Sequence, residues 1–146
     1  MYKYKEVSEG TYVLSLDNHV EICQALGEFC KEKEIYAGAV NGLGAICEAT
    51  FRFLDPATKQ YVDKTFSEQM EITNLTGNIS QKPEDPFTPY LHIHITASRR
   101  DYSCVGGHLL SARVNGACEL VVQDYQENAV LERYFDSGIG LNLYKF

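Results

Sequence analysis

The segment that most constrains the fold of this chain is residues 91–98, which read Leu-His-Ile-His-Ile-Thr-Ala-Ser. Apolar and polar residues alternate strictly along it, which is the pattern of a β-strand with one buried face and one polar face. His92 and His94 fall on the polar face, about 6–7 Å apart along the strand. A third histidine, His108, follows in a Gly-Gly-His sequence, so three of the four histidines in the chain lie within seventeen residues.

The short polar stretch after this strand, residues 99–102, predicts the tip of a β-hairpin, and the length of its loop decides where His108 lies. Directly paired residues of an antiparallel ladder point to the same face of the sheet. If Ser98 pairs with Tyr102 across a three-residue loop, His92 lies opposite His108.

Two other loop lengths remain open. If Ser98 pairs with Cys104 across a five-residue loop, His94 lies opposite His108. A four-residue loop would turn His108 to the other face, unless the Gly-Gly pair before it forms a β-bulge. Most of these pairings therefore gather three imidazoles on one surface.

Three neutral imidazoles that leave a fourth position open suit Zn²⁺ or a similar divalent ion. We therefore predict a divalent metal site formed by His92, His94 and His108, with zinc as the leading candidate. The alternative is a polar strand face without a ligand, because histidine is tolerated on half-exposed strands. The fourth histidine, His19, is far from these three in the sequence, and we interpret it as a surface residue.

The charge of the chain bears on its partners. The net charge is −7 and the pI about 5.0, and such a surface repels nucleic acid phosphates unless basic residues cluster. One such cluster is Arg99 with Arg100 at the hairpin tip, which a trimer would repeat three times. Direct DNA binding through this tip is one hypothesis, and an anionic membrane surface is disfavoured.

The five cysteines indicate a reducing compartment. Their number is odd and no Cys-x-x-Cys pair occurs, which argues against a disulfide framework or a thiolate zinc ribbon. The first five residues lead into Glu and Ser rather than into the apolar run of a signal peptide. No stretch approaches the length of a membrane span. We therefore expect a cytoplasmic protein.

The periodicity along the chain predicts many strands and one helix. The helix is expected from Asn18 to about Lys33, with Asn18 and Glu21 forming a capping box. Residues 81–90 hold three of the four prolines and are expected to form an exposed loop. Strands are expected at 11–16, 35–40, 47–54, 70–80, 91–98, 117–123 and 141–146 and in the second arm of the hairpin, while 59–66 and 130–135 are less regular.

These elements amount to an α+β fold. We expect one domain over residues 1–146, in which a twisted, mainly antiparallel sheet of about seven or eight strands packs with one main helix. So many strands with so little helix leave a sheet edge or face uncovered, and oligomerisation is one way to cover it.

The glycines at positions 42 and 44 form a Gly-x-Gly sequence that invites a dinucleotide-binding interpretation. The third glycine of that fingerprint is missing, and the residues that follow alternate like a strand. A phosphate cradle needs the N-terminus of a helix at this point. We therefore expect these glycines in a tight turn or where two backbones approach closely.

Four motifs occur in an order and spacing that resemble the plants-and-prokaryotes conserved (PPC) domain, over about residues 12–146. They are Gly-Leu-Gly-Ala-Ile at 42–46, the β-rich run at 70–80, Leu-His-Ile-His at 91–94 and Gly-Gly-His-Leu at 106–109. The resemblance implies an α+β fold that assembles as a homotrimer. It also implies a metal-binding set that carries over to His92, His94 and His108.

The same resemblance bears on DNA. Plant members of the family carry an AT-hook, a short basic segment that enters the minor groove, and act in transcription and chromatin. This chain contains no Arg-Gly-Arg-Pro core of such a hook, which removes the part that grips DNA in the plant proteins. The resemblance therefore implies a stand-alone bacterial type in a DNA-associated or regulatory role, with DNA or a transcription-related protein as partner.

Two function hypotheses follow. The first is a non-enzymatic trimeric module whose metal serves structure or ligand binding. The alternative is a metal-dependent enzyme acting on a small molecule, because a metal held by three histidines lowers the pKa of its bound water to about 7. Glu71 and Glu119 are then candidate general bases, and Arg100 and Arg113 candidate anion clamps. Of these, we predict Glu71, Arg100 and Arg113 as ligand-binding residues and assign no catalytic residue.

Overall fold

The computed structural model describes residues 1–125 and 130–146. Its elements follow one another as β1 (Tyr2–Ser8), β2 (Thr11–Leu16), α1 (Ile22–Glu32), β3 (Gly38–Asp55), β4 (Gln60–Phe66), β5 (Met70–Lys82), β6 (Asp85–Ser98), β7 (Cys104–Asp124), β8 (Arg133–Asp136) and β9 (Leu141–Tyr144). The single helix is too short to cross a bilayer, and the described part of the chain holds no other.

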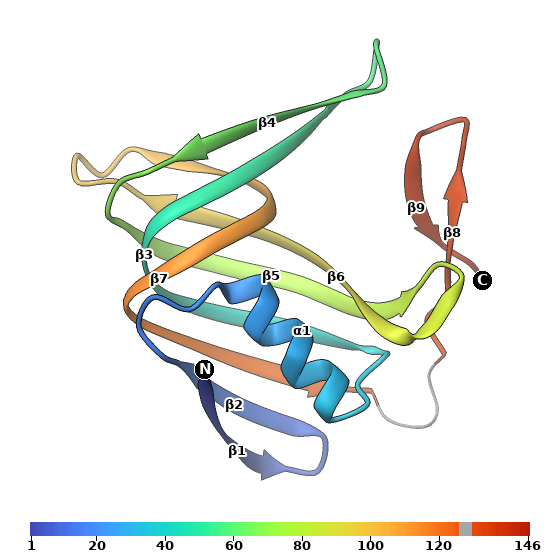
Figure 1. Cartoon of the computed structure of the whole chain (residues 1–146), viewed down its shortest axis with the longest axis horizontal. Helices are drawn as coiled ribbons and strands as arrows, with labels where there is room; N and C mark the ends of the chain where they lie inside the picture. The colour runs from blue at the N-terminus through green and yellow to red at the C-terminus, as the bar shows by residue number, and fades with distance from the viewer. Residues whose placement is uncertain (126–129) are drawn as a thin grey trace.

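Seven strands form one antiparallel sheet in the order β1-β2-β7-β6-β5-β3-β4. Because β3 also pairs with β7, the strands β3, β5, β6 and β7 close into a ring (Figure 1). Helix α1 packs against β6 and β7. The prediction of an α+β fold with a mainly antiparallel sheet and one helix is confirmed.

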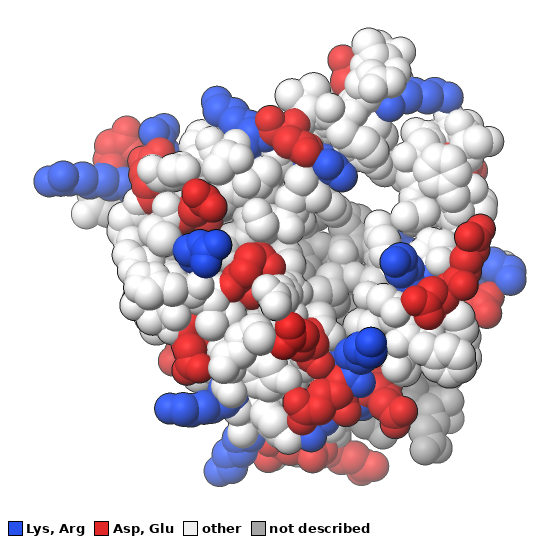
Figure 2. Space-filling view, viewed as in Figure 1, with Lys and Arg blue, Asp and Glu red and all other residues white. Residues whose placement is uncertain are grey.

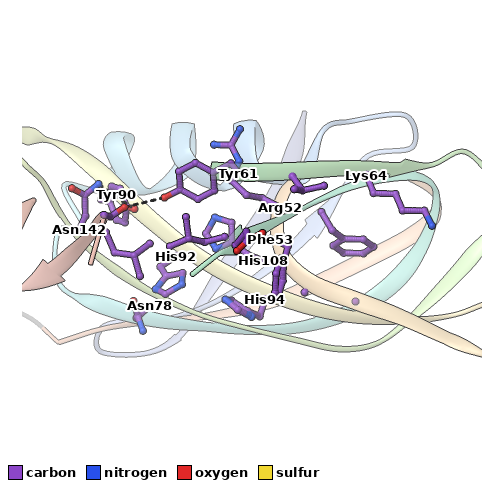
Figure 3. Close-up of a pocket in the computed structure, with 18 of the residues that line it drawn as sticks. Arg52, Phe53, Tyr61, Lys64, Asn78, Tyr90, His92, His94, His108 and Asn142 are labelled. Atoms are coloured by element: carbon purple, nitrogen blue, oxygen red, sulfur yellow. Dashed lines mark hydrogen bonds between the residues drawn. The ribbon is translucent and has the colours of Figure 1, made fainter. Parts of the chain in front are cut away.

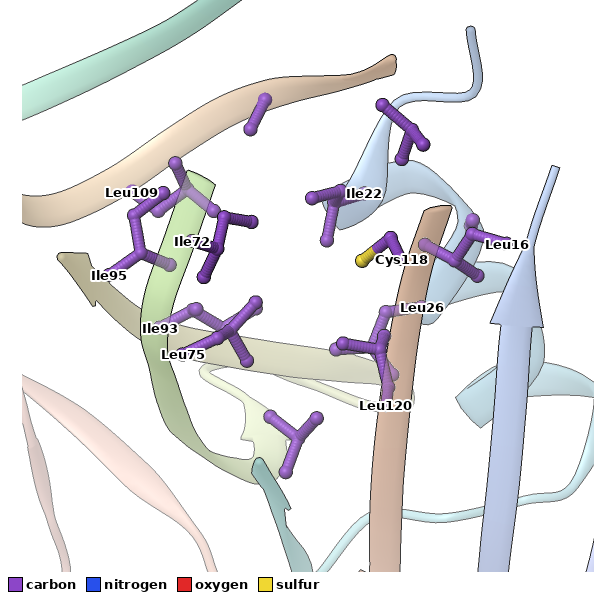
Figure 4. Packing of buried hydrophobic residues seen from close by; sticks show 14 of the residues in the cluster. Leu16, Ile22, Leu26, Ile72, Leu75, Ile93, Ile95, Leu109, Cys118 and Leu120 are labelled. Atoms are coloured by element: carbon purple, nitrogen blue, oxygen red, sulfur yellow. The ribbon is translucent and has the colours of Figure 1, made fainter. Parts of the chain in front are cut away.

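The core lies where the apolar faces of β2, β3, β5, β6 and β7 meet the helix. On β6, Ile93 and Ile95 are almost completely buried, as the alternation along the histidine strand predicts. Burying one such side chain stabilises the fold by about 1.5–3 kcal/mol. The apolar face of α1 covers one side of this cluster through Ile22 and Leu26 (Figure 4) and through Phe29.

The helix begins four residues later than expected. Glu21 is the N-cap, and its carboxylate accepts hydrogen bonds from the backbone N–H groups of Cys23 (3.0 Å) and Gln24 (2.6 Å). His19 has a φ of 65°, a left-handed conformation that cannot belong to an α-helix. The side chain of Asn18 instead accepts a hydrogen bond from the N–H of Gly116. The capping box at Asn18 was therefore a wrong prediction, because a tertiary contact takes that side chain away.

Residues 81–90 were wrongly predicted as a loop. Strand β6 begins at Asp85, directly after a tight turn in which Glu84 has a φ of 64°. Pro83 lies in the turn itself. Pro86 and Pro89 are tolerated in β6 because the first half of β6 pairs with β5 only, whereas its pairing with β7 starts at His94. Proline lacks an N–H donor and is confined to such one-sided stretches of a sheet.

The Gly-x-Gly sequence lies inside β3, which joins two of the predicted strands into one. A bulge falls between Gly42 and Gly44 where β3 pairs with β5. A Cβ atom on Gly42 would lie 2.6 Å from the carbonyl oxygen of Glu119 on β7. The glycine therefore permits the close approach of β3 and β7, which confirms the second of the two sequence interpretations.

Each end of the chain forms a β-hairpin that the sequence did not predict. Strand β1, which was not predicted, pairs with β2 at one edge of the sheet. Strand β9 pairs with β8 in a separate two-stranded sheet, rather than extending the main sheet. This β8–β9 hairpin stands beside the main sheet, across from the arm formed by β3 and β4 (Figure 1).

Candidate metal centre

The sequence left three loop lengths open for the hairpin of β6 and β7, and the structure has the loop of five residues. Ser98 pairs with Cys104, and His94 therefore lies directly opposite His108. The loop is closed by a hydrogen bond from the N–H of Arg99 to the carbonyl of Ser103, at 2.8 Å. The register of this one hairpin decides that His108 shares a face with the other two histidines.

The three imidazoles converge outside the apolar core. The ring centroids of His92 and His94 are 5.2 Å apart, those of His92 and His108 are also 5.2 Å apart, and those of His94 and His108 are 5.4 Å apart. One ring nitrogen of each residue lies within 4.8 Å of the others. Figure 3 shows the rings of His92 and His108 side by side, with His94 below them.

This arrangement fits a tetrahedral metal ion. Zinc–imidazole bonds of about 2.0–2.1 Å hold the ligand nitrogens about 3.4 Å apart, which small side-chain rotations would reach from the present separation. The donor set is nitrogen only, which suits zinc and related transition metals rather than magnesium or calcium. His92, His94 and His108 would hold such an ion and leave its remaining position open.

The protonation state of the histidines also suits a metal. Burial, with additional repulsion from His108 and His94, lowers the pKa of His92 to about 4. Burial likewise lowers the pKa of His108, and the charges of His94 and Arg52 act in the same direction. At neutral pH both imidazoles are therefore neutral, which is the form that binds metals.

Strand β5 approaches the histidine strand closely at a glycine. Gly77 pairs with Ile93, the residue between His92 and His94. A Cβ atom on Gly77 would lie 2.7 Å from the carbonyl oxygen of His92. A larger residue would push β5 away from β6 and displace the backbone that carries two of the three imidazoles.

The histidines open onto a cavity of about 1380 Å³. It lies between the β3–β4 arm and the β8–β9 hairpin, where the space-filling view is hollowed (Figures 2 and 3). Its walls are mainly apolar and aromatic and include Phe53, Tyr61, Val62, Tyr90, Leu141 and Tyr144. The volume suffices for a small organic molecule.

The family model of the Plants and Prokaryotes Conserved (PCC) domain, also abbreviated PPC, matches residues 4–126. The chain belongs to this family. No curated protein matches it.

Three solved structures are similar along their whole length. A proposed DNA-binding protein from Bacteroides thetaiotaomicron is 53% identical, with a TM-score of 0.93, over 100% of this chain and 98% of that one. A metal-containing protein from Archaeoglobus fulgidus is 32% identical (TM-score 0.84, coverage 100% and 99%). A proposed DNA-binding protein from Ralstonia eutropha is 31% identical (TM-score 0.86, coverage 99% and 96%).

On one side of the cavity of this PCC-domain protein, an ion pair lies next to the three histidines. Arg52 on β3 pairs with His108 across the sheet. Its guanidinium donates to both carboxylate oxygens of Asp63, at 2.8 Å each, and packs over the ring of Tyr61. The positive charge of Arg52 is therefore neutralised within the protein.

On the opposite side, Arg133 at the start of β8 approaches the same centre. Its guanidinium donates to the hydroxyl of Ser80 (2.8 Å), the side-chain oxygen of Asn78 (2.8 Å) and the carbonyl of Asn142 (2.9 Å). Asn78 is paired with His92 across β5 and β6. These contacts connect the β8–β9 hairpin to the strands that carry the histidines.

The four other residues singled out in the sequence lie away from the cavity. Glu71 pairs with Ser98 at the far end of the β5–β6 ladder, and Arg100 lies in the loop after that strand. Arg113 donates to the carbonyl of His19 near the start of α1, and Glu119 pairs with β2. None of the four lines the cavity.

Sequence reasoning missed Arg52 and Arg133, which do line it. The alternating pattern of residues 47–54 could have placed Arg52 on a strand face. No sequence signal connects Arg133 to the histidines, because it is twenty-five residues from His108 and its partners Asn78 and Ser80 are more than fifty residues away.

Proposed function

We propose that this PCC-domain protein binds one divalent metal ion per chain through His92, His94 and His108, with zinc as the favoured ion. The proposal rests on one observation: three imidazole nitrogens within 4.8 Å of one another face a cavity rather than the core. The metal-containing protein from Archaeoglobus fulgidus, 32% identical over the whole chain, supports it.

The metal would serve to bind a small molecule in the adjacent cavity. An ion of this kind supplies a Lewis-acidic position, and in enzymes it can also activate water. Catalysis of that type further needs a general base within hydrogen-bonding reach of the reacting group. Among the described residues that line the cavity, the one carboxylate is Asp55, whose oxygen already accepts hydrogen bonds from the N–H groups of Ala57 and Thr58. A binding role is therefore favoured over the metal-dependent enzyme.

The test is the metal content of tag-free protein, measured by mass spectrometry. We expect one metal per chain in the wild type and loss of most of it in His92→Ala and His108→Ala, because two imidazoles bind much more weakly than three. His19→Ala is the matched control, since this fourth histidine lies outside the site and should leave the metal content unchanged. Wild-type protein without stoichiometric metal would contradict the proposal.

A DNA-associated or regulatory role is the second candidate, because the 53% identical protein from Bacteroides thetaiotaomicron is described as a proposed DNA-binding protein. The net charge of −7 disfavours direct contact with phosphates. On the face seen in Figure 2, Lys and Arg side chains are scattered among Asp and Glu. The association would therefore run through a transcription-related partner protein.

Duplex DNA binding, measured by fluorescence anisotropy at low and at about 0.15 M salt, tests this distinction. The expected result is weak binding that disappears at the higher salt. Binding that persists at 0.15 M and is lost in Arg100→Ala would instead support direct contact through the β6–β7 hairpin tip.

The assembly in this proposal is a cytoplasmic homotrimer. Val13, Leu43 and Val121 lie exposed on neighbouring strands of the same sheet, and all three surround one shallow apolar depression. Such a surface is typical of contacts between subunits. Native mass spectrometry should find trimers in the wild type and smaller species in Val121→Asp. The five free cysteines agree with a reducing compartment.

A further inference from the structure

Arg133 is a buried charge without an opposite charge beside it among residues 1–125 and 130–146. Its exposed fraction is 8%, and its three hydrogen-bond acceptors, from Ser80, Asn78 and Asn142, are all neutral. No carboxylate among the described residues forms an ion pair with it. Buried guanidinium groups are normally paired, because removing an ion from water is unfavourable unless another charge compensates it.

Two aromatic rings stabilise this charge without neutralising it. The guanidinium carbon lies 4.0 Å from the ring centroid of Tyr144 and 4.9 Å from that of Tyr90. Cation–π contacts of this kind lower the energy of the cation but contribute no negative charge. Three of the five N–H groups of Arg133 have acceptors within the described part of the chain, which leaves two N–H groups to donate to a ligand.

The unpaired charge belongs to the cavity of the metal centre. Arg133, Tyr90 and Tyr144 line it together with the histidines. Asn78, which accepts a hydrogen bond from Arg133, is the strand neighbour of His92, so the guanidinium lies about one strand spacing beyond the metal centre. The other arginine of the cavity, Arg52, already has Asp63 as its counter-ion.

We propose that the cavity binds a small organic monocarboxylate, whose carboxylate group accepts hydrogen bonds from the two remaining N–H groups of Arg133. Lys64 also lines the cavity but is exposed, so Arg133 is the buried cation of the lining that has no ion pair among the described residues. One such buried charge matches one negative charge, and the planar guanidinium matches the planar carboxylate. The apolar body of the ligand packs against Tyr90, Tyr144 and the apolar walls of the cavity. The inference rests on the small-molecule cavity of the proposed function, but Arg133 is not a metal ligand, so it holds with or without metal.

The test is isothermal titration calorimetry of the full chain with acetate, hexanoate and benzoate, using benzamide as the neutral counterpart of benzoate. We expect saturable binding of benzoate or hexanoate and none of benzamide. Arg133→Met should weaken that binding at least tenfold. Arg100→Met is the matched control, because it makes the same change at an exposed arginine outside the cavity and should bind as the wild type.

Two further measurements keep the outcome clear. Because Arg133 also holds the β8–β9 hairpin, Arg133→Met could lose the cavity itself. In the wild type, NMR should therefore show contacts between the bound ligand and the rings of Tyr90 and Tyr144. The titration is run on metal-loaded and on metal-stripped protein. A failure of the metal proposal can then be distinguished from a failure of the carboxylate proposal. Absence of binding by all three carboxylates, equal binding of benzamide and benzoate, or wild-type affinity in Arg133→Met would overturn the inference.

Discussion

The two walls of the cavity are built in different ways. The β3–β4 arm is part of the seven-stranded sheet, and β3 pairs with β4 from Ala49 to Asp55. The β8–β9 hairpin is a sheet of its own, and Arg133 connects it to β5 through hydrogen bonds to Ser80 and Asn78. Two longer bonds, from Asn142 to the hydroxyl of Tyr90 and from the hydroxyl of Tyr61 to the carbonyl of Gly140, also contact the hairpin. Each wall carries one arginine next to the three histidines, yet Arg52 has a counter-ion and Arg133 has none among the residues that the structure describes.

The difference teaches what each arginine does. Arg52 and Asp63 are both partly exposed, and an ion pair of this kind contributes at most about 1 kcal/mol to stability. The hydrogen bond of Arg133 to Ser80 is buried and its two others are partly buried, and bonds from a charged donor contribute more to stability than neutral ones. The β3–β4 arm would keep its place without its arginine, because a continuous ladder of backbone pairs joins β3 and β4. Arg133, in contrast, supplies hydrogen bonds that join the separate β8–β9 hairpin to β5.

The largest expected effect is that of Arg133→Met on the β8–β9 hairpin. The substitution leaves the oxygens of Ser80 and Asn78 without their donor, and we expect the free energy of unfolding to fall by about 2–4 kcal/mol. Hydrogen exchange should accelerate over residues 133–144 and remain slow in β5 and β6. Equal acceleration in the whole sheet would show that the hairpin is not a separately held unit.

A second prediction concerns the centre between the walls and its dependence on pH. Folding lowers the pKa of His92 from 6.5 to about 4, chiefly by burial. Between these values the unfolded chain binds a proton that the folded chain does not, so stability increases with pH there. The free energy of unfolding of metal-free protein should reach its full value above about pH 6.5 and decrease as the pH falls toward 4. Urea denaturation at several pH values measures this, and His92→Leu should flatten the curve.

The smallest expected effect is that of Arg52→Met. Because the Arg52–Asp63 pair is partly exposed, the free energy of unfolding should change by no more than about 1 kcal/mol. Chemical denaturation beside Arg133→Met compares the two walls directly. A loss for Arg52→Met as large as that for Arg133→Met would remove the contrast between them.

The sequence determined the features that depend on local periodicity. The alternation of residues 91–98 placed Ile93 and Ile95 in the core and His92 and His94 on the opposite face, because successive side chains of a strand must point in opposite directions. The same periodicity was enough for the α+β fold class. The resemblance of the motifs added the family, which the match over residues 4–126 confirms.

Only the tertiary structure decided the features that depend on contacts between distant segments. The pairing of Ser98 with Cys104 selected one hairpin register among several that the sequence allowed. The hydrogen bond between Asn18 and Gly116 takes the place of the predicted cap at Asn18, so the helix begins at Ile22. Arg133 is joined to the histidine strand through Asn78, which is fifty-five residues away in the chain and pairs with His92. Periodicity reports which face a side chain occupies, but which strands and side chains meet is set by the packing energy of the complete fold.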